Sequence, residues 1–372
     1  MSKLRQFIVM AGGSGERFWP LSRQTRPKQL LPLGESDRSL LQEAVDRLLA
    51  ISGADQVYVA TSRPLRPSIL AAGLPLPDRN VIAEPAKRNT AGCVSYAIAE
   101  LIARNPGVEP SDISLGFVTA DHHIPQSDLF LQVVQRAMDA VEAIPAIGIV
   151  GISPSRVETG YGYVRYFKDP VKELKESNDL PVYPVQAFLE KPSRELAEQF
   201  IEQGNCLWNS GMFFGTVETF LNELSKTSPP HFDAIGKMVE AIRDSDEAQL
   251  AAVFDSLPDI SIDYALAEKA SRVVVVRTDL VWDDIGAWDA VSRTKPRDNS
   301  GNVVVGEAEL IDCNECVVYN DFSDAGRAVA VIGVEDLVVV ATDGGVLVMP
   351  KSRSQDVKLA VQKLKEKNSR QL

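Results

Sequence analysis

The chain has 372 residues, of which 45% are hydrophobic and 24% are charged, and its formal net charge is −12. This length suits one large domain with a smaller one, and the composition is sufficient for a hydrophobic core. The negative charge argues against a nucleic-acid partner, because binding to a phosphate backbone needs a basic face. No signal peptide is evident and no apolar run approaches the ~20 residues of a membrane-spanning helix, so we expect a cytoplasmic protein without membrane contact.

Strand and helix patterns alternate through the first 150 residues. Short apolar or β-branched runs predict strands at 7–10, 56–60, 80–83, 114–119 and 146–151. Apolar residues at helical spacing predict helices at 40–51, 66–72, 91–104 and 129–144. Because strands that alternate with helices form βαβ units, we expect a Rossmann-like, mixed but mostly parallel sheet.

The middle of the chain is more mixed. Strand patterns occupy 161–167, 184–189, 208–216 and 272–277, and helical patterns occupy 193–203, 217–254 and 262–270. Ser193 is expected to cap the helix that follows it, and Glu195 in the first turn is favoured by the helix dipole.

A turn-rich stretch at 295–301 marks a boundary, so we predict a catalytic domain at 1–296 and a small β-rich domain at 297–372. Strand patterns follow at 302–305, 316–319, 328–332, 337–340 and 346–348, with a final helix at 355–367. Strands at intervals of about ten residues indicate either a small β-domain or a few turns of β-helix. The domain either packs against the catalytic domain or forms a subunit contact, as it would in a homodimer.

The four cysteines are sparse for a disulfide scaffold and are consistent with a reducing cytosol. They are Cys93, Cys206, Cys313 and Cys316. The last two form a lone C-x-x-C without a second pair, so we interpret them as buried thiols rather than as a metal or redox site.

A glycine-rich turn follows the first strand. Its glycines are Gly12, Gly13 and Gly15. They let the backbone approach a ligand and adopt positive φ, and successive N–H groups in such a turn can point at one anion. Two cations follow, Arg17 and Lys28. Amide donors, a guanidinium and an ammonium near one strand end predict a site for several phosphates.

Two familiar glycine motifs do not match this turn. A P-loop would need Gly-Lys-Ser/Thr, and the dinucleotide fingerprint lacks its third glycine because residue 18 is Phe. The glycines alone also fit an ordinary strand-to-helix turn. The whole pattern, G-G-x-G-x-R-x-x-P-L followed by x-P-K-Q, resembles the signature of the sugar-1-phosphate nucleotidyltransferases. Its Arg-Pro-Lys-Gln ending, 26–29, resembles the mannose-1-phosphate guanylyltransferase branch.

Two further strand ends carry polar residues. Asn89 lies in a string that resembles the family segment P-x-x-R-N-T-A, which meets the base; the residues alone favour a helix cap instead. Asp121 directly follows the strand at 114–119, where ligands bind in open α/β sheets, so it is a nucleotide and Mg²⁺ ligand candidate, with a turn aspartate as the alternative. We assign packing rather than zinc or base chemistry to His122 and His123.

Three motifs resemble segments that the family uses for the sugar. They are T-G-Y-G-Y with Gly162, E-K-P with Glu190 and Lys191, and W-N-S-G-M-F with Asn209. A carboxylate and an amide can bind sugar hydroxyls, and an ammonium can take the sugar phosphate as a point charge. A hairpin corner and a surface ion pair are the alternatives for the first two motifs.

The last motif resembles the family pattern W-x-D-[IV]-G-x-W, which implies that Asp284 is the second Mg²⁺ carboxylate; a helix N-cap at Asp283 or Asp284 is the alternative. We interpret Asp263 as structural. The resemblance implies attack of mannose 1-phosphate on GTP, with Arg17, Lys28 and Lys191 acting on the phosphates. The rivals are a related enzyme that uses dTTP or ATP with glucose 1-phosphate, and a catalytically silent regulatory subunit. The charged site residues are all present, which argues against the silent subunit.

Overall fold

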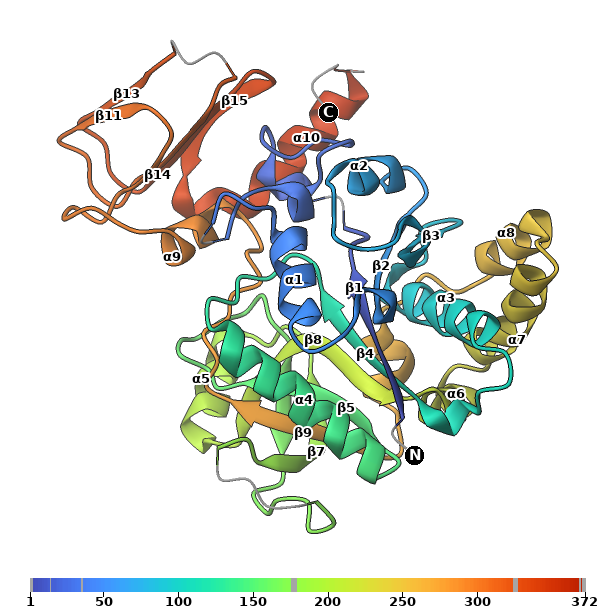
Figure 1. The fold of residues 1–372 in the computed structure, drawn as a ribbon. Helices are drawn as coiled ribbons and strands as arrows, with labels where there is room; N and C mark the ends of the chain where they lie inside the picture. Colours follow the sequence, from blue (N-terminus) through green and yellow to red (C-terminus); the bar gives the residue numbers. More distant parts are fainter. Residues whose placement is uncertain are drawn as a thin grey trace.

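The computed structural model describes residues 3–13, 15–34, 36–174, 179–323, 327–367 and 369. A nine-stranded sheet with the order β3-β2-β1-β4-β8-β5-β9-β7-β6 forms its centre (Figure 1). The strands are β1 (Leu4–Met10), β2 (Val57–Ser62), β3 (Val81–Glu84), β4 (Ile113–Thr119), β5 (Ile147–Ile152), β6 (Tyr163–Tyr166), β7 (Val182–Leu189), β8 (Cys206–Thr216) and β9 (Val273–Thr278).

The sheet is mixed, as expected. Strands β1 to β4 form a parallel half, and β5 pairs in parallel with β9. Strand β8 runs antiparallel between β4 and β5, and joins the two parts. Both faces of β1 are buried, with Phe7 and Val9 in one core and Ile8 in the other, because side chains alternate along a strand.

Helices cover both faces of the sheet. On one face lie α1 (Leu40–Leu49), α2 (Arg66–Ala71), α4 (Ser127–Ala143) and α5 (Arg194–Gln203). On the other lie α3 (Asn89–Arg104), α6 (Val217–Thr227), α7 (Pro229–Arg243) and α8 (Glu247–Asp255). Within the described part of the chain, no helix is both long and apolar enough to cross a bilayer.

The local predictions in the middle of the chain hold, with one correction. Ser193 caps α5, because its side chain accepts a hydrogen bond from the amide of Leu196 at 3.3 Å. The helical patterns predicted at 217–254 form the three helices α6, α7 and α8. The helix expected at 262–270 is a short π-helix, Asp263–Ala267. This shortening keeps Asp263 at the start of a local turn instead of inside a regular helix.

The C-terminal part contains two small sheets. Strands β10 (Val303–Val305), β12 (Val317–Asp321) and β14 (Leu337–Thr342) pair in parallel, and β15 (Gly345–Pro350) closes that sheet. Strands β11 (Ala308–Ile311) and β13 (Val329–Ile332) form the second sheet. β11 was not predicted, since its sequence AELI carries no β-branched run. Of the two predicted alternatives, a small β-domain and a few turns of β-helix, stacked parallel strands of this kind match the β-helix. Cys313 and Cys316 are free and buried, as predicted.

The C-terminal part shares a hydrophobic core with the N-terminal glycine region. The core includes Phe18 and Leu21 from that region, Trp288 from a short helical segment before α9 (Val291–Thr294), and Tyr319 from β12. The ring of Trp288 lies 5.2 Å from that of Phe18 and 5.5 Å from that of Tyr319, centroid to centroid. Helix α10 (Val357–Glu366) adds Val361 to the same core. The C-terminal part therefore packs against the catalytic domain.

Removing residues 297–372 should destabilise the protein, because Phe18 and Trp288 would lose their cover of apolar side chains. We expect a lower Tm and aggregation in sizing chromatography. A control truncation after Lys367 removes no member of this core and should behave like the full chain. A stable, monodisperse protein that ends at residue 296 would contradict the prediction.

Candidate active site

The glycine turn crosses directly over the segment that carries Lys28. Gly15 has φ +61°, and a Cβ on it would lie only 2.7 Å from the backbone nitrogen of Lys28. A glycine is therefore required at this crossing. A Cβ on Gly13 would meet no atom within 4 Å, so the space above this part of the turn is open to a ligand. Ser14 lies outside the described residues.

Lys28 joins three segments that are distant in sequence. Its side chain is only 9% exposed, and its Nζ donates to Asp121 Oδ2 at 2.8 Å and to the backbone oxygen of Asp284 at 2.6 Å. Asp121 follows the end of β4, and Asp284 lies in the loop after β9. The structure thus brings together the predicted phosphate-binding lysine and both predicted metal carboxylates.

The two carboxylates have opposite pKa shifts. Burial raises the pKa of Asp121, but the charge of Lys28, its hydrogen bond and further favourable interactions together outweigh burial, so the pKa lies below its usual value. Burial raises the pKa of Asp284, and the negative charges of Asp283 and Asp121 add to this against the attraction of Lys28. The Tyr161 hydroxyl also donates to Asp284. A site with an excess of negative charge favours binding of a cation.

The donor set fits a magnesium ion shared with a ligand. Mg²⁺ is usually held by one or two carboxylates plus substrate phosphates and water. In the described ranges, no group of three or more His, Cys, Asp or Glu side chains could hold a metal alone. Asp121 and Asp284 supply the two carboxylates of an arrangement in which phosphate oxygens and water are the other ligands.

Arg17 lies beside Asp284. Its Nη1 donates to the backbone oxygen of Gly286 at 2.9 Å, and the rest of the guanidinium is exposed. A Cβ on Gly286 would lie 3.1 Å from the Asp284 carboxylate and 3.4 Å from Arg17 Nη1. The absence of a side chain at Gly286 lets the guanidinium and the carboxylate converge.

The predicted sugar residues also converge. A Cβ on Gly162 would lie 2.8 Å from Glu190 Oε2 and 3.6 Å from Asn209 Cβ. The amide of Asn209 donates to Asp263 at 2.8 Å, so Asp263 belongs to this cluster, where it fixes the Asn209 side chain; this contact is consistent with the predicted structural role. Lys191 lies at the rim, 64% exposed, and pairs with Glu190 at 2.9 Å.

Asn89 does not cap helix α3, contrary to the interpretation that its residue type favours. The N-cap residue is Arg88, and Asn89 accepts a hydrogen bond from the amide of Thr90 at 2.9 Å. Thr90 instead accepts from the amide of Ile262. The Asn89 side chain thus bonds its own turn and connects to no other segment through the described contacts.

Three of the non-glycine residues with positive φ lie in the predicted motifs. They are Asn89 (φ 56°), Lys191 (φ 44°) and Ile285 (φ 43°). This conformation is costly, most of all for β-branched Ile285, which is fully buried. Such strain persists where the surroundings enforce it, and it is concentrated at functional sites.

Asp283 anchors the loop that carries Asp284. Its carboxylate accepts from Arg293 Nε at 2.7 Å, from Arg156 Nη2 at 3.2 Å and from the amide of Ile285 at 2.9 Å. Sequence reasoning missed both arginines, because neither lies in a recognisable motif. Asp283 is therefore an ion-pair anchor of the loop and not the helix N-cap of the alternative interpretation.

His122 is a packing residue, as predicted. Its Nδ1 accepts from Trp282 Nε1 at 3.0 Å, and the two rings meet edge to face. Burial lowers the pKa of His122 to about 4, so the ring is neutral at pH 7.

Glu84 is a buried carboxyl beneath the glycine turn that the sequence analysis did not assign. It ends β3, is 6% exposed, and its Oε1 would lie 3.8 Å from a Cβ on Gly12. Burial raises its pKa to about 7, although a hydrogen bond with Cys93 acts in the opposite direction. The rule that located Asp121, a carboxylate at a strand end, would also have found Glu84.

Comparisons with known proteins establish the family of the chain. The nucleotidyl transferase family model matches residues 6–300, and a model of the MannoseP isomerase/GMP-like beta-helix domain matches residues 306–364. The chain belongs to the nucleotidyl transferase family. It is 37% identical to a mannose-1-phosphate guanylyltransferase of Klebsiella pneumoniae, over 96% of this chain and 74% of that protein. It is also 37% identical to the alginate biosynthesis protein AlgA of Pseudomonas aeruginosa, over 96% of this chain and 71% of AlgA.

A solved structure resembles the whole chain. The Thermus thermophilus protein, described as a mannose-1-phosphate geranyltransferase, matches with a TM-score of 0.84 and 32% identity. The match covers 97% of this chain and 99% of that one. A mannose-6-phosphate isomerase from Helicobacter pylori matches with a TM-score of 0.55 at 21% identity, over 75% of this chain and 99% of that one, which supports the fold alone.

The raised pKa of Glu84 predicts a pH-dependent stability effect. The folded state keeps this proton up to about pH 7, whereas the ordinary value is 4.5, so the residue destabilises the fold increasingly as pH rises through this window. The free energy of unfolding of Glu84→Gln, relative to that of wild type, should therefore be about 1–3 kcal/mol higher at pH 8 than at pH 5. Urea denaturation at both pH values measures the gain, with exposed Glu109→Gln as control. An equal difference at both pH values would contradict the prediction.

Proposed function

We propose that this protein transfers GMP from GTP to mannose 1-phosphate, and so forms GDP-mannose and pyrophosphate. The observation that carries the proposal is the contact of Lys28 with Asp121 and with the Asp284 loop. The sugar cluster lies next to it, because Tyr161 donates to Asp284 and the adjacent Gly162 faces Glu190 and Asn209. Similarity to proteins named mannose-1-phosphate guanylyltransferase supports this pair of substrates.

The reaction needs little acid-base chemistry. A phosphate monoester has its second pKa near ~6 and is mostly dianionic at neutral pH, so mannose 1-phosphate is already a nucleophile. One of its oxygens attacks the α-phosphorus of GTP, and the bond from that phosphorus to the bridging β-oxygen breaks. Pyrophosphate leaves with the electron pair, and no covalent enzyme intermediate forms. Charge neutralisation and in-line placement therefore supply the rate enhancement.

Residues of the glycine turn and its neighbours would neutralise the negative charge of the phosphates. The exposed guanidinium of Arg17 and the ammonium of Lys28 would neutralise the β- and γ-phosphates that leave. Backbone N–H groups from Gly12 to Gly15 would bind the same oxygens. Asp121 and Asp284 would hold Mg²⁺, which when bound adds Lewis-acid neutralisation of the phosphates.

Base selection would depend on acceptors near the glycine turn. Guanine presents N–H donors on its Watson–Crick edge, including the N2 amino group that distinguishes it from adenine. The Glu84 carboxyl group beside Gly12 is a suitable acceptor, because its carbonyl oxygen accepts a hydrogen bond in the protonated form as well as in the ionised form. The Asn89 amide offers both a donor and an acceptor to the base.

Sugar binding would use the cluster around Gly162. Carboxylate and amide oxygens of Glu190 and Asn209 accept hydrogen bonds from hydroxyl groups, and the lack of a side chain at Gly162 leaves room for a ring. Lys191, whose side chain is mostly exposed at the rim, would position the attacking phosphate.

Pyrophosphate release with Mg²⁺ tests the proposal directly. GTP, ATP, UTP and dTTP are each combined with mannose 1-phosphate and with glucose 1-phosphate. We expect turnover with GTP and mannose 1-phosphate at a rate at least about tenfold above any other pair, since one set of contacts selects both substrates. Preference for another pair would keep the mechanism and overturn the specificity. No release with any pair would favour a silent regulatory subunit.

Asp284→Asn should lower kcat by about 10²–10³-fold, because the neutral amide is a poor magnesium ligand and leaves phosphate charge uncompensated. The Tm should stay the same or rise, since the substitution relieves repulsion from Asp283 and Asp121. Exposed Asp279→Asn in the same loop is the matched control. Stabilisation by Mg²⁺ in the presence of GTP, measured by thermal shift, should disappear only in the Asp284 variant. Unchanged turnover would remove the metal assignment.

A further inference from the structure

Helix α10, near the C-terminal end, packs on the turn that carries Arg17 (Figure 1). This turn is the 3₁₀ segment Glu16–Phe18, which begins at Gly15 in the left-handed conformation. Phe18 is fully buried in the core that also contains Val357 and Val361 of α10. One side of the turn thus faces the phosphate site, and the other faces the end of the chain.

An ion pair connects the same two elements. Lys365 Nζ lies 2.6 Å from Glu16 Oε1, although the residues are 349 positions apart. The two side chains are 48% and 39% exposed, so the pair contributes only ~0–1 kcal/mol to overall stability. The location of the ion pair matters more than its contribution to stability, because Glu16 immediately precedes Arg17 in the chain.

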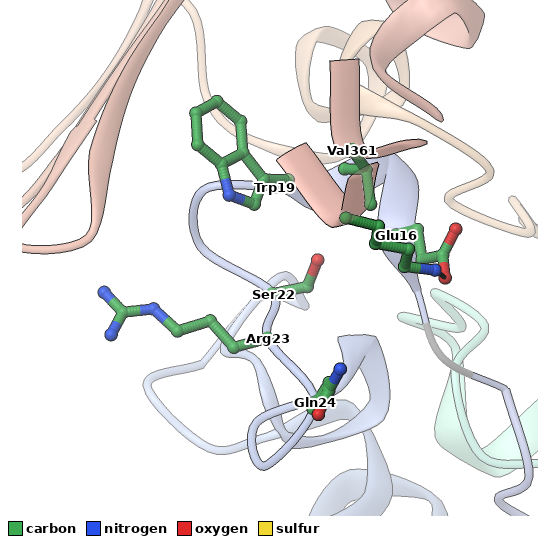
Figure 2. Close-up of a pocket in the computed structure, with 7 residues that line it drawn as sticks. Glu16, Trp19, Ser22, Arg23, Gln24 and Val361 are labelled. Atoms are coloured by element: carbon green, nitrogen blue, oxygen red, sulfur yellow. Dashed lines mark hydrogen bonds and ion pairs between the residues drawn. The ribbon is translucent and has the colours of Figure 1, made fainter. Parts of the chain in front are cut away.

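The contact between the helix and the turn is incompletely packed. A cavity of about 110 Å³ separates them, lined by Glu16, Trp19, Ser22, Arg23, Gln24, Val361 and Lys365. Figure 2 shows Val361 of α10 at this cavity together with Trp19 and Glu16. Side chains leave this space unfilled, and the Glu16–Lys365 ion pair joins the turn to α10 across it.

Hydrogen bonds within the turn set its local shape, from the amide of Phe18 to the carbonyl of Gly15 at 2.9 Å and from the amide of Trp19 to the carbonyl of Glu16 at 3.1 Å. Ser22 Oγ donates to the backbone oxygen of Gly15 at 2.7 Å, and Arg17 itself is held through one described hydrogen bond, to Gly286. The glycines before the turn add no side-chain contacts. These bonds set the shape of the turn. Its position relative to the phosphate site, and with it the direction of the guanidinium, depends on the contacts that Glu16 and Phe18 make with α10.

We propose that α10 is a positioning element for the phosphate site, in which the Glu16–Lys365 ion pair and Val361 hold the Arg17 turn in the orientation that binds the nucleoside triphosphate. Glu16 and Lys365 act through Arg17 and touch no substrate. The role of Arg17 toward the triphosphate rests on the proposed function; the restraint of the turn by α10 does not.

A double-mutant cycle tests this coupling. Glu16→Gln and Lys365→Met each remove one charge with little change in size, and GTP affinity is measured by calorimetry for both singles and the double variant. We expect each single change to weaken GTP binding about three- to fivefold, the equivalent of a surface ion pair. The double variant should be no weaker than either single, because the interaction can be lost only once. Lys365→Arg should restore binding.

The matched control is Lys363→Met, which removes an exposed charge from the same helix. It should leave GTP affinity unchanged. In steady-state kinetics, KM for GTP should rise in the Lys365 variant while kcat changes less than about twofold, and Tm should hardly move. A loss of stability alone would not produce that pattern.

Hydrogen exchange separates this inference from the proposed function. Amides of residues 15–24 should exchange faster in Lys365→Met than in Lys363→Met, even if no nucleotide pair supports turnover. Equal exchange in the two variants, or additive losses of GTP affinity in the cycle, would overturn the proposal.

Discussion

The ammonium group of Lys28 is almost buried, and its position depends on two groups from other parts of the chain. A buried cation is costly unless it is paired and hydrogen-bonded. The Asp121 carboxylate and the Asp284 carbonyl provide those bonds, so the end of β4, the loop after β9 and the Lys28 turn must meet at one point. Gly15 allows this meeting, since the turn crosses the Lys28 backbone where a side chain would collide.

The loop with Asp284 shows how a costly conformation is maintained. Ile285 has a positive φ and is buried, and the neighbouring Asp283 carboxylate is fixed by two arginines, one in the loop after β5 and one in α9. Ile285 also belongs to the core shared by Phe18, Trp288 and the C-terminal strands. Polar anchoring on one side and apolar packing on the other hold the backbone carbonyl of Asp284 against Lys28, and so fix the position of the carboxylate proposed to bind Mg²⁺.

Much of the fold could be predicted, because strands such as β1 are apolar on both faces and are followed by polar residues at one sheet edge. That rule located Asp121, whereas Asp284 was located by its resemblance to the family motif W-x-D-[IV]-G-x-W; the structure brings the two residues to the same site. The rule was not applied to Glu84, which has the same location. Arg156 could not be found, since it pairs with Asp283 across 127 positions and such a pair leaves no local pattern. The strand β11 and the π-helix at Asp263–Ala267 depend on tertiary packing that overrides local preference.

The shared core has a consequence for how the protein is made. Phe18 and Leu21 are translated early, but Val357 and Val361, which complete their packing, follow more than three hundred positions later in the chain. Contacts of such long sequence separation form late, because the intervening chain must first be ordered. The central sheet can fold while translation continues, whereas the glycine turn gains its final surroundings only after synthesis of α10. Nucleotide-binding competence should therefore arise after translation of this helix, as a late step of folding.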